Sequence, residues 1–121
     1  MKKKILFVDD ESDLLRVSSI RLRKTGYDVF EAIDGEEALD LTRERMPDLI
    51  LLDVFLPKMQ GDEVARILKG DEKLKHIPII LISADVVNLE KKFKECGADD
   101  YLTKPFASGE LIDMIKKYEP L

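Results

Sequence analysis

The stretch of residues 47–53, Pro-Asp-Leu-Ile-Leu-Leu-Asp, decides the fold of this chain. Its four consecutive aliphatic residues form an unbroken apolar run that ends on Asp53. Three further segments end on polar residues in the same way: Ile5 to Val8 on Asp9 and Asp10, Ile79 to Ile82 on Ser83, and Tyr101 to Thr103 on Lys104. Short apolar runs are typical of strands buried on both faces of a parallel sheet. Because ligands bind beyond the carboxyl ends of such strands, these polar side chains are expected to share one pocket.

Helical segments lie between these strands along the whole chain. Each is marked by an apolar face or a boundary residue: Leu15, Ser18, Ser19 and Leu22 before Gly26; Leu39, Thr42 and Met46 after the capping pair Asp34 and Glu37; Val64, Ile67 and Leu68; Leu89, Phe93 and Cys96 before Gly97; and Leu111, Ile115 and Tyr118 after a Ser108 cap. Tyr27 to Ile33 alternates in polarity and predicts an edge strand. Five βα units predict a single domain over residues 1–121, α/β in class and flavodoxin-like, with a doubly wound sheet of five parallel strands in the order 2-1-3-4-5.

Composition limits the functions that the chain can have. Its 121 residues suit one domain, and no apolar segment is long enough to span a bilayer. The net charge of −5 argues against direct binding to nucleic acid or to an anionic membrane. Cys96 is the single cysteine, so no intramolecular disulfide can form and the chain suits the reducing cytoplasm. Its place on an apolar helix face indicates a small packing residue and not a redox group.

The predicted pocket brings several carboxylates close together. Two carboxylates about 4 Å apart repel by roughly 4 kcal/mol at an effective dielectric near 20, and one lysine offsets only part of that repulsion. A divalent cation is therefore expected, and an all-oxygen site suits Mg²⁺, with Asp9 and Asp10 as ligands. Asp53, at the end of the predicted central strand, is then the best candidate for a nucleophile that attacks a phosphoryl group. Lys104 and Ser83 would cover the phosphoryl oxygens.

Each of these residues also has a simpler interpretation. Asp9 and Asp10 could cap a helix, Asp53 could be a turn residue, Ser83 could cap the fourth helix, and Lys104 could be a solvated loop charge. Their joint occurrence at the ends of separate strands favours a functional site. The Lys104-Pro105 bond is expected to be cis, which would turn the lysine toward the pocket; a trans proline that starts the last helix is the alternative.

Six short motifs lie at these strand ends and in the loops that follow: Val8-Asp9-Asp10-Glu11, Pro47 to Asp53, Leu56-Pro57 with Gly61, Ile82-Ser83-Ala84, Gly97-Ala98, and Tyr101 to Phe106. Together they resemble the receiver domain of the two-component response regulators, and of the chemotaxis receivers among them. The resemblance covers Ile5 to about Tyr118. The combination of motifs is highly specific, although each motif alone is not.

By this resemblance, Asp53 accepts a phosphoryl group from a phosphohistidine on a sensor histidine kinase or a histidine phosphotransfer protein. The resemblance also implies that Mg²⁺ is bound directly by Asp10, Asp53 and the Phe55 backbone carbonyl, and partly through water by Asp9. The phosphoryl oxygens would be contacted by Ser83, Lys104 and the Ala84 N–H. Tyr101 would be an aromatic switch. From spacing alone, Tyr101 would instead be a strand aromatic that covers the sheet edge. His76 is the sole histidine and is expected to be a solvated loop residue, so the donor must be another molecule.

The implied function is a signalling switch that is read on the surface of the fourth helix, fifth strand and fifth helix. A downstream protein is the expected partner, through binding or onward phosphotransfer, and a homodimer through the same surface is a further option. No enzyme activity is expected beyond the domain's own phosphorylation and dephosphorylation.

Four positions stand out against the usual family pattern. Ser83 stands where many relatives have threonine, and Gln60 stands where they often have Asp or Asn. Phe55 and Asp85 flank the expected path of attacking water. A bulky Phe55 would slow hydrolysis, whereas Asp85 would either repel or orient the water, so the phosphoryl lifetime stays open.

Other function classes are weaker. A Mg²⁺-dependent phosphatase of the haloacid dehalogenase kind would carry a second acid two residues after its nucleophile, and Phe55 occupies that position after Asp53. The two acids after the first strand disfavour a nucleotide or flavin site, and no glycine-rich phosphate loop is present. An inert adaptor is disfavoured because the acids, hydroxyl and lysine are all present. The chain could also be the N-terminal receiver of a longer DNA-binding regulator.

Overall fold

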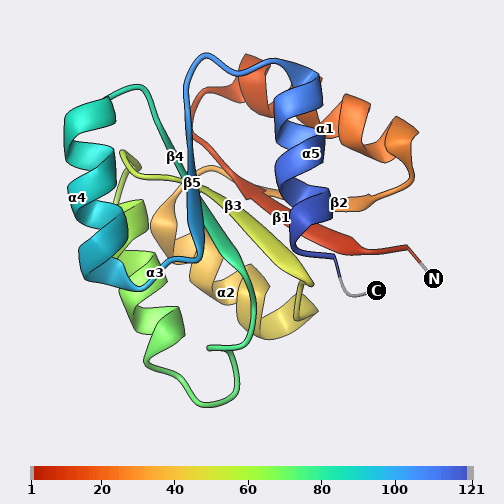
Figure 1. Ribbon diagram of the computed structural model, residues 1–121. Coiled ribbons are helices and arrows are strands. Elements are labelled where there is room, and N and C mark those ends of the chain that lie inside the picture. Colours follow the sequence, from red (N-terminus) through yellow and green to blue (C-terminus); the bar gives the residue numbers. More distant parts are fainter. Residues whose placement is uncertain (1, 120–121) are drawn as a thin grey trace.

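The computed structural model describes residues 2–119, so the ends of the predicted domain, Met1, Pro120 and Leu121, lie outside it. Strands and helices alternate along the chain (Figure 1). Their bounds are β1 Lys4–Val8, α1 Ser12–Thr25, β2 Asp28–Ala32, α2 Gly35–Arg45, β3 Leu49–Asp53, α3 Gly61–Lys69, β4 Ile79–Ser83, α4 Val86–Cys96, β5 Asp100–Thr103 and α5 Ser108–Lys117. Within the described residues, no helix has the length and apolar character needed to cross a membrane.

The five strands form one parallel sheet in the order β2-β1-β3-β4-β5, which confirms the predicted topology. β1, β3 and β4 are interior strands, and all five residues of β3 and of β4 are buried, as their apolar runs predict. β2 and β5 lie at the two edges and are only partly buried. The interior strands therefore deliver their terminal residues to the middle of one sheet edge.

Successive residues of each interior strand pack on opposite faces of the sheet. Helices α2, α3 and α4 cover one face, and α1 and α5 cover the other (Figure 1). The first face buries Leu6, Val8, Ile50, Leu52, Ile79 and Leu81, and the second buries Ile5, Phe7, Leu49, Leu51, Ile80 and Ile82. Because both faces are covered, the strands need apolar residues at every position, which explains their unbroken runs.

Most predicted helix faces are confirmed, with three corrections. Met46 does not face the core: it ends α2 in the left-handed conformation at φ 47° before Pro47, and its side chain is exposed. Ile67 also lies partly outside, because Val64, Ala65 and Leu68 form the buried stripe of α3.

The third correction concerns the start of α5. Ser108 is the first residue of this helix and does not cap it; Ala107 is the N-cap, and its N–H donates to the Glu110 carboxylate at 3.1 Å. The Ser108 hydroxyl instead accepts a hydrogen bond from Arg21 of α1 at 3.3 Å. Ser108 therefore links two helices.

Other local predictions hold. Asp34 caps α2 by accepting the Glu37 N–H, the Lys104–Pro105 bond is cis, His76 is exposed, and Cys96 is a buried free thiol. Burial raises the pKa of Cys96, in agreement with a packing role.

Candidate functional site

The carboxyl ends of the strands bring the predicted site residues together. Backbone hydrogen bonds hold neighbouring ends level: Asp9 N to Ala32 O, Val54 N to Ile82 O and Lys104 N to Ser83 O, at 2.9–3.0 Å. One open hollow is lined by residues from four of these ends: Asp10, Glu11, Asp53, Phe55, Ser83, Ala84, Asp85 and Lys104. The expectation that separate strand ends share one pocket is therefore met in the structure.

Three aspartates form the acidic part of this pocket. Asp9 and Asp53 are buried and Asp10 is exposed, and oxygens from the three carboxylates lie within 4.8 Å of one another. Burial and the negative charge of Asp9 raise the pKa of Asp53 to about 6, although Lys104 and the Phe55 N–H act in the opposite direction. The ionised carboxylate of Asp53 is thus disfavoured relative to an exposed aspartate.

Lys104 is the cation at the centre of the cluster. Its Nζ lies 2.8 Å from Asp53 Oδ2, 2.9 Å from Asp9 Oδ2 and 2.9 Å from Glu11 Oε1. Burial disfavours the charged ammonium, but its hydrogen bonds to these carboxylates outweigh burial and raise the pKa of Lys104 above its ordinary value. One ammonium thus neutralises only part of a charge set that also includes Asp10.

The donor set fits a hard divalent cation. Asp9 Oδ1 accepts the Glu11 N–H and Asp53 Oδ1 accepts the Phe55 N–H, which fixes both carboxylates. Asp9 Oδ2 is buried and, apart from its ion pair with Lys104, has no hydrogen-bond partner among the described residues. The carboxylates of Asp9, Asp10 and Asp53 therefore form a suitable ligand set for Mg²⁺, with Asp9 Oδ2 as a buried oxygen that lacks a hydrogen bond from any described residue.

Ser83 is buried, and its Oγ accepts the Asp85 N–H at 3.1 Å. Within residues 2–119, the Ser83 hydroxyl donates no hydrogen bond. Ser83 does not cap α4, because Asp85 is the N-cap and its side chain accepts the Asn88 N–H. The hydrogen bonds from Asn88 lower the pKa of Asp85, so this acid at the pocket wall is ionised at neutral pH.

Tyr101 is not in the pocket. It pairs with Leu81 in the sheet, two residues before Ser83, and its ring packs on Phe93 of α4 with the centroids 5.0 Å apart. Its position is that of a half-buried aromatic at the sheet edge. A switch role for Tyr101 therefore requires a second conformation.

The sequence did not indicate two sets of contacts around the pocket. Glu11 on Lys104 is one of them, because these residues are far apart in the chain. The other joins Lys92 of α4 to Asp62 of α3 at 3.3 Å and places Lys92 Nζ 5.8 Å from the Phe55 ring centroid. Spacing along one chain gives no signal for either.

Glycine at position 61 lets the loop after Asp53 fold back on β3. The Gly61 N–H donates to the Val54 carbonyl at 2.8 Å, and a Cβ on Gly61 would lie 2.0 Å from the Asp53 carbonyl oxygen. No other residue fits this close approach. The glycine in the sequence motif is thus explained by the backbone next to the central acid.

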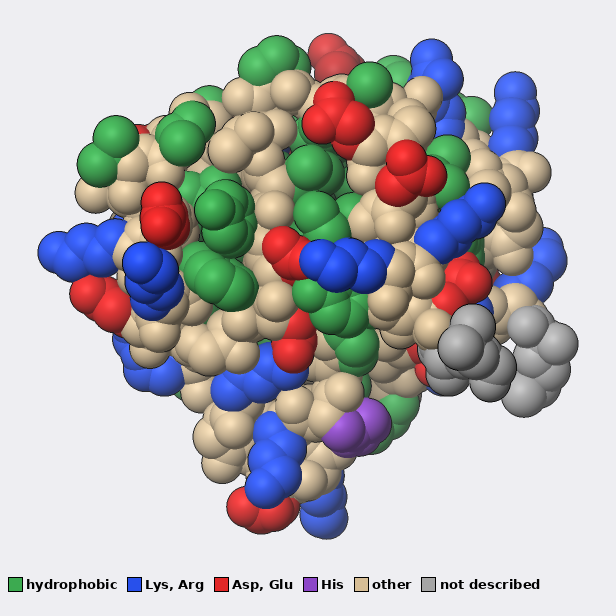
Figure 2. Space-filling view, viewed as in Figure 1, with side chains coloured by type: hydrophobic (Ala, Val, Ile, Leu, Met, Phe, Trp, Pro, Cys, Tyr) green, Lys and Arg blue, Asp and Glu red, His purple; other side chains and the backbone are tan. Residues whose placement is uncertain are grey.

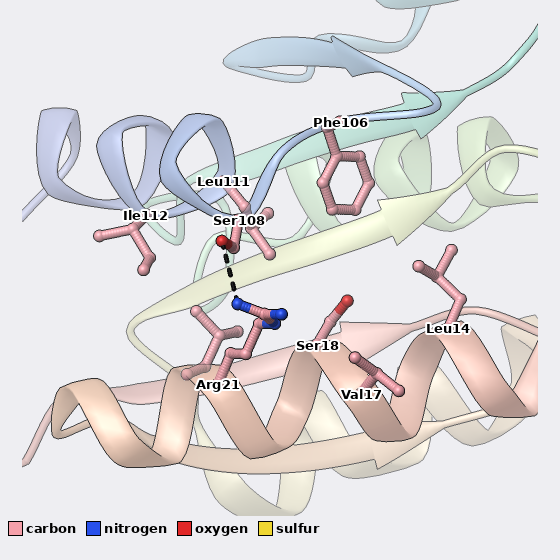
Figure 3. A pocket seen from close by; sticks show the side chains of 9 residues that line it. Leu14, Val17, Ser18, Arg21, Phe106, Ser108, Leu111 and Ile112 are labelled. Carbon is pink, nitrogen blue, oxygen red and sulfur yellow. Dashed lines mark hydrogen bonds between the residues drawn. The ribbon is translucent and has the colours of Figure 1, made fainter.

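A second hollow adjoins the acidic pocket on the side of α1 and α5. It shares Glu11 and Lys104 with the acidic pocket and is also lined by Leu14 and Phe106. Leu14 and Phe106 in turn line a groove between the two helices, where Arg21 reaches Ser108 (Figure 3). Most of the residues that line this groove are apolar, and the groove lies next to a strongly charged site.

Comparisons with known proteins agree with this geometry. Residues 5–116 match the response regulator receiver domain family. A putative response regulator from Chloroflexus aurantiacus is similar at 32% identity over 98% of each chain, with a TM-score of 0.92. The chemotaxis response regulator CheY4 of Vibrio cholerae is similar at 29% identity, over 98% of this chain and 100% of that one, with a TM-score of 0.91.

A third similar structure is the receiver domain of a sensor histidine kinase from Pseudomonas aeruginosa, described with a magnesium ion coordinated in its active site cleft. It is 29% identical over 98% of each chain, with a TM-score of 0.90. The family match spans nearly the whole sequence and agrees with both the strand order and the acidic pocket. This chain therefore belongs to the response regulator receiver domain family of two-component signalling.

Proposed function

We propose that this chain is a single receiver domain that acts as a phosphorylation-dependent switch, with Asp53 as the phosphoacceptor. One observation carries this proposal: Lys104 Nζ lies 2.8 Å from Asp53 Oδ2 in a solvent-open pocket shared with two further aspartates. The donor is a phosphohistidine on a histidine kinase or a phosphotransfer protein.

In the proposed step, a carboxylate oxygen of Asp53 forms a bond to phosphorus while the P–N bond of the donor breaks. The electron pair of that bond stays on the imidazole nitrogen, which takes up a proton as it leaves. Lys104 and the Ser83 hydroxyl bind phosphoryl oxygens, together with the Ala84 N–H. Asp9, Asp10, Asp53 and the Phe55 carbonyl would hold Mg²⁺, which supplies charge neutralisation for the transferring group.

The output we propose is a change in the surface formed by α4, β5 and α5. Figure 2 shows hydrophobic side chains exposed between α4 and α5, with acidic and basic side chains around them. When Ser83 turns to the phosphoryl group, Tyr101 would leave its place on Phe93 and alter this surface. The partner is a downstream protein or a second copy of the chain, in the cytoplasm.

Phosphorylation by a small acyl phosphate with Mg²⁺ tests the chemistry. The intact mass should rise by one phosphoryl group, and the rise should be lost in Asp53→Asn. It should persist in Asp40→Asn, a matched change on the exposed face of α2. A rise that persists in Asp53→Asn would refute the assignment.

Beryllofluoride with Mg²⁺ tests the switch separately. Its addition should move the amide resonances of Ser83 and Tyr101. If the protein is phosphorylated but both resonances stay unchanged, the proposed phosphoryl transfer stands and the proposed switch is refuted.

A further inference from the structure

We propose that Glu11 is a positioning residue that holds Lys104 in the resting site and disfavours small anionic phosphodonors. This inference rests on the proposed function of Asp53. It assigns to Glu11 a role in which its carboxylate and an incoming phosphoryl group compete for the same ammonium. An ion pair joins Glu11, in the loop after β1, to Lys104, the residue after β5.

A capping role does not explain the Glu11 side chain. Glu11 is the N-cap of α1 and its carbonyl accepts the Leu15 N–H, but its carboxylate makes no capping hydrogen bond to the helix. The carboxylate crosses to Lys104 Nζ at 2.9 Å instead. A side chain that is 64% exposed and could be fully hydrated is thus directed into the site.

Three carboxylates surround the Lys104 ammonium: Asp53 and Glu11 accept its hydrogen bonds, and Asp9 forms an ion pair with it. An ammonium group has three N–H bonds, and three carboxylate oxygens lie within 2.9 Å of Nζ. Asp9 and Asp53 are buried and are each fixed by a backbone N–H. Glu11 is therefore the partner that Lys104 releases most easily when phosphoryl oxygens arrive.

The position of Glu11 also places its charge at the entrance. Glu11 lines both the acidic pocket and the adjoining hollow on the α1 side. With Asp10 and Asp85 at the same mouth, a small donor that carries two negative charges meets further negative charge before it reaches Asp53. A phosphohistidine presented by a docked protein would gain contact energy that a small molecule lacks, and would be less affected.

The ion pair itself can be measured in the metal-free protein. Lysine ammonium groups that are held in ion pairs exchange slowly with water and are visible in ¹H–¹⁵N spectra. We expect the Lys104 signal to broaden or disappear in Glu11→Ala. It should remain in the control variant Glu44→Gln, because Glu44 lies in the last turn of α2, near the amino end of β1 and away from the pocket. An unchanged Lys104 signal in Glu11→Ala would overturn the positioning role.

Donor kinetics test the consequence. With acetyl phosphate at saturating Mg²⁺ and low salt, Glu11→Gln should lower the donor concentration for half-maximal rate by roughly threefold, the effect of one exposed charge on a dianion through water. The difference should shrink at high salt, which a purely structural effect would not do. Glu44→Gln should match the wild-type protein.

The possible outcomes separate the two levels of inference. If neither the wild-type protein nor Glu11→Gln is phosphorylated, the proposed function fails. If both are phosphorylated with the same donor and salt dependence, the proposed function stands and the role of Glu11 is refuted.

Discussion

Replacement of Asp53 by asparagine should stabilise the metal-free protein near neutral pH. Asp53 is 5% exposed, beside Asp9, and its pKa is raised to about 6 from an ordinary 3.8. The ionised form is therefore less favourable in the folded chain than in the unfolded chain. An asparagine of nearly the same shape removes this charge and can still accept a hydrogen bond from Lys104.

The size of the gain follows from the pKa values. A change from 3.8 to about 6 corresponds to about 3 kcal/mol of disfavoured ionisation. This shift already includes the favourable contact of the carboxylate with Lys104, which acts to lower the pKa. The increase in the free energy of unfolding should therefore reach at most about 3 kcal/mol.

The sign of the pH dependence is fixed by the same values. Below about pH 4 the Asp53 carboxyl is protonated in the folded state, so the wild-type protein carries no penalty there. The penalty grows between about pH 4 and pH 6 and is complete above that range, because the unfolded chain releases its proton at lower pH than the folded chain. The advantage of Asp53→Asn should therefore be small at the acidic end and largest near neutrality.

Urea unfolding followed by circular dichroism in the presence of a chelator measures this difference, since the chain has no tryptophan. Asp40→Asn, an exposed acid of α2, controls for the change in net charge. A variant that is less stable than the wild-type protein near neutral pH, or equally more stable at both ends of the pH range, would refute the reasoning.

Three further predictions concern the loop, the core and the cation. Gly61→Ala should lower the free energy of unfolding by about 2–4 kcal/mol in chemical denaturation, because its Cβ would lie 2.0 Å from a backbone oxygen, whereas Gly109→Ala, with nothing within 4 Å, should be neutral or slightly stabilising. Leu51→Ala, fully buried in the central strand, should cost about 2–5 kcal/mol by the same measurement. Added Mg²⁺ should raise the melting temperature of the wild-type protein to a plateau in thermal scans, and the midpoint should move to higher Mg²⁺ in Asp10→Asn.

The interior of the fold was the most predictable part of the sequence. Unbroken apolar runs occur where a strand is covered on both faces, so β3 and β4 carried a clear signal. The predictions were wrong at helix ends, as with Met46 and Ser108, and at the border of a buried helix face, as with Ile67. At these positions, a left-handed cap, a shift of one residue around the helix or a contact from another helix decides the side chain's environment.

The site was predictable to the extent that parallel strands end at one edge. That rule brought Asp53, Ser83 and Lys104 to the same pocket without any knowledge of contacts. It could not give the Glu11–Lys104 ion pair, because side-chain reach across the sheet edge depends on the actual backbone. It also could not place Tyr101, which the structure leaves on Phe93, outside the pocket.

The acidic pocket lowers the stability of the metal-free domain, because Asp53 is buried beside Asp9. A chain selected for stability alone would not bury Asp53 beside Asp9 or leave Asp9 Oδ2 with the Lys104 ion pair as its one partner among the described residues. A cation bound by the three aspartates would reduce the repulsion between their carboxylates. Because it would bind the folded site and not the unfolded chain, it would raise the free energy of unfolding. If the site binds Mg²⁺, the repulsion that Asp53→Asn should relieve would also be the source of that affinity. The variant that is more stable without metal should therefore gain less stability when Mg²⁺ is added.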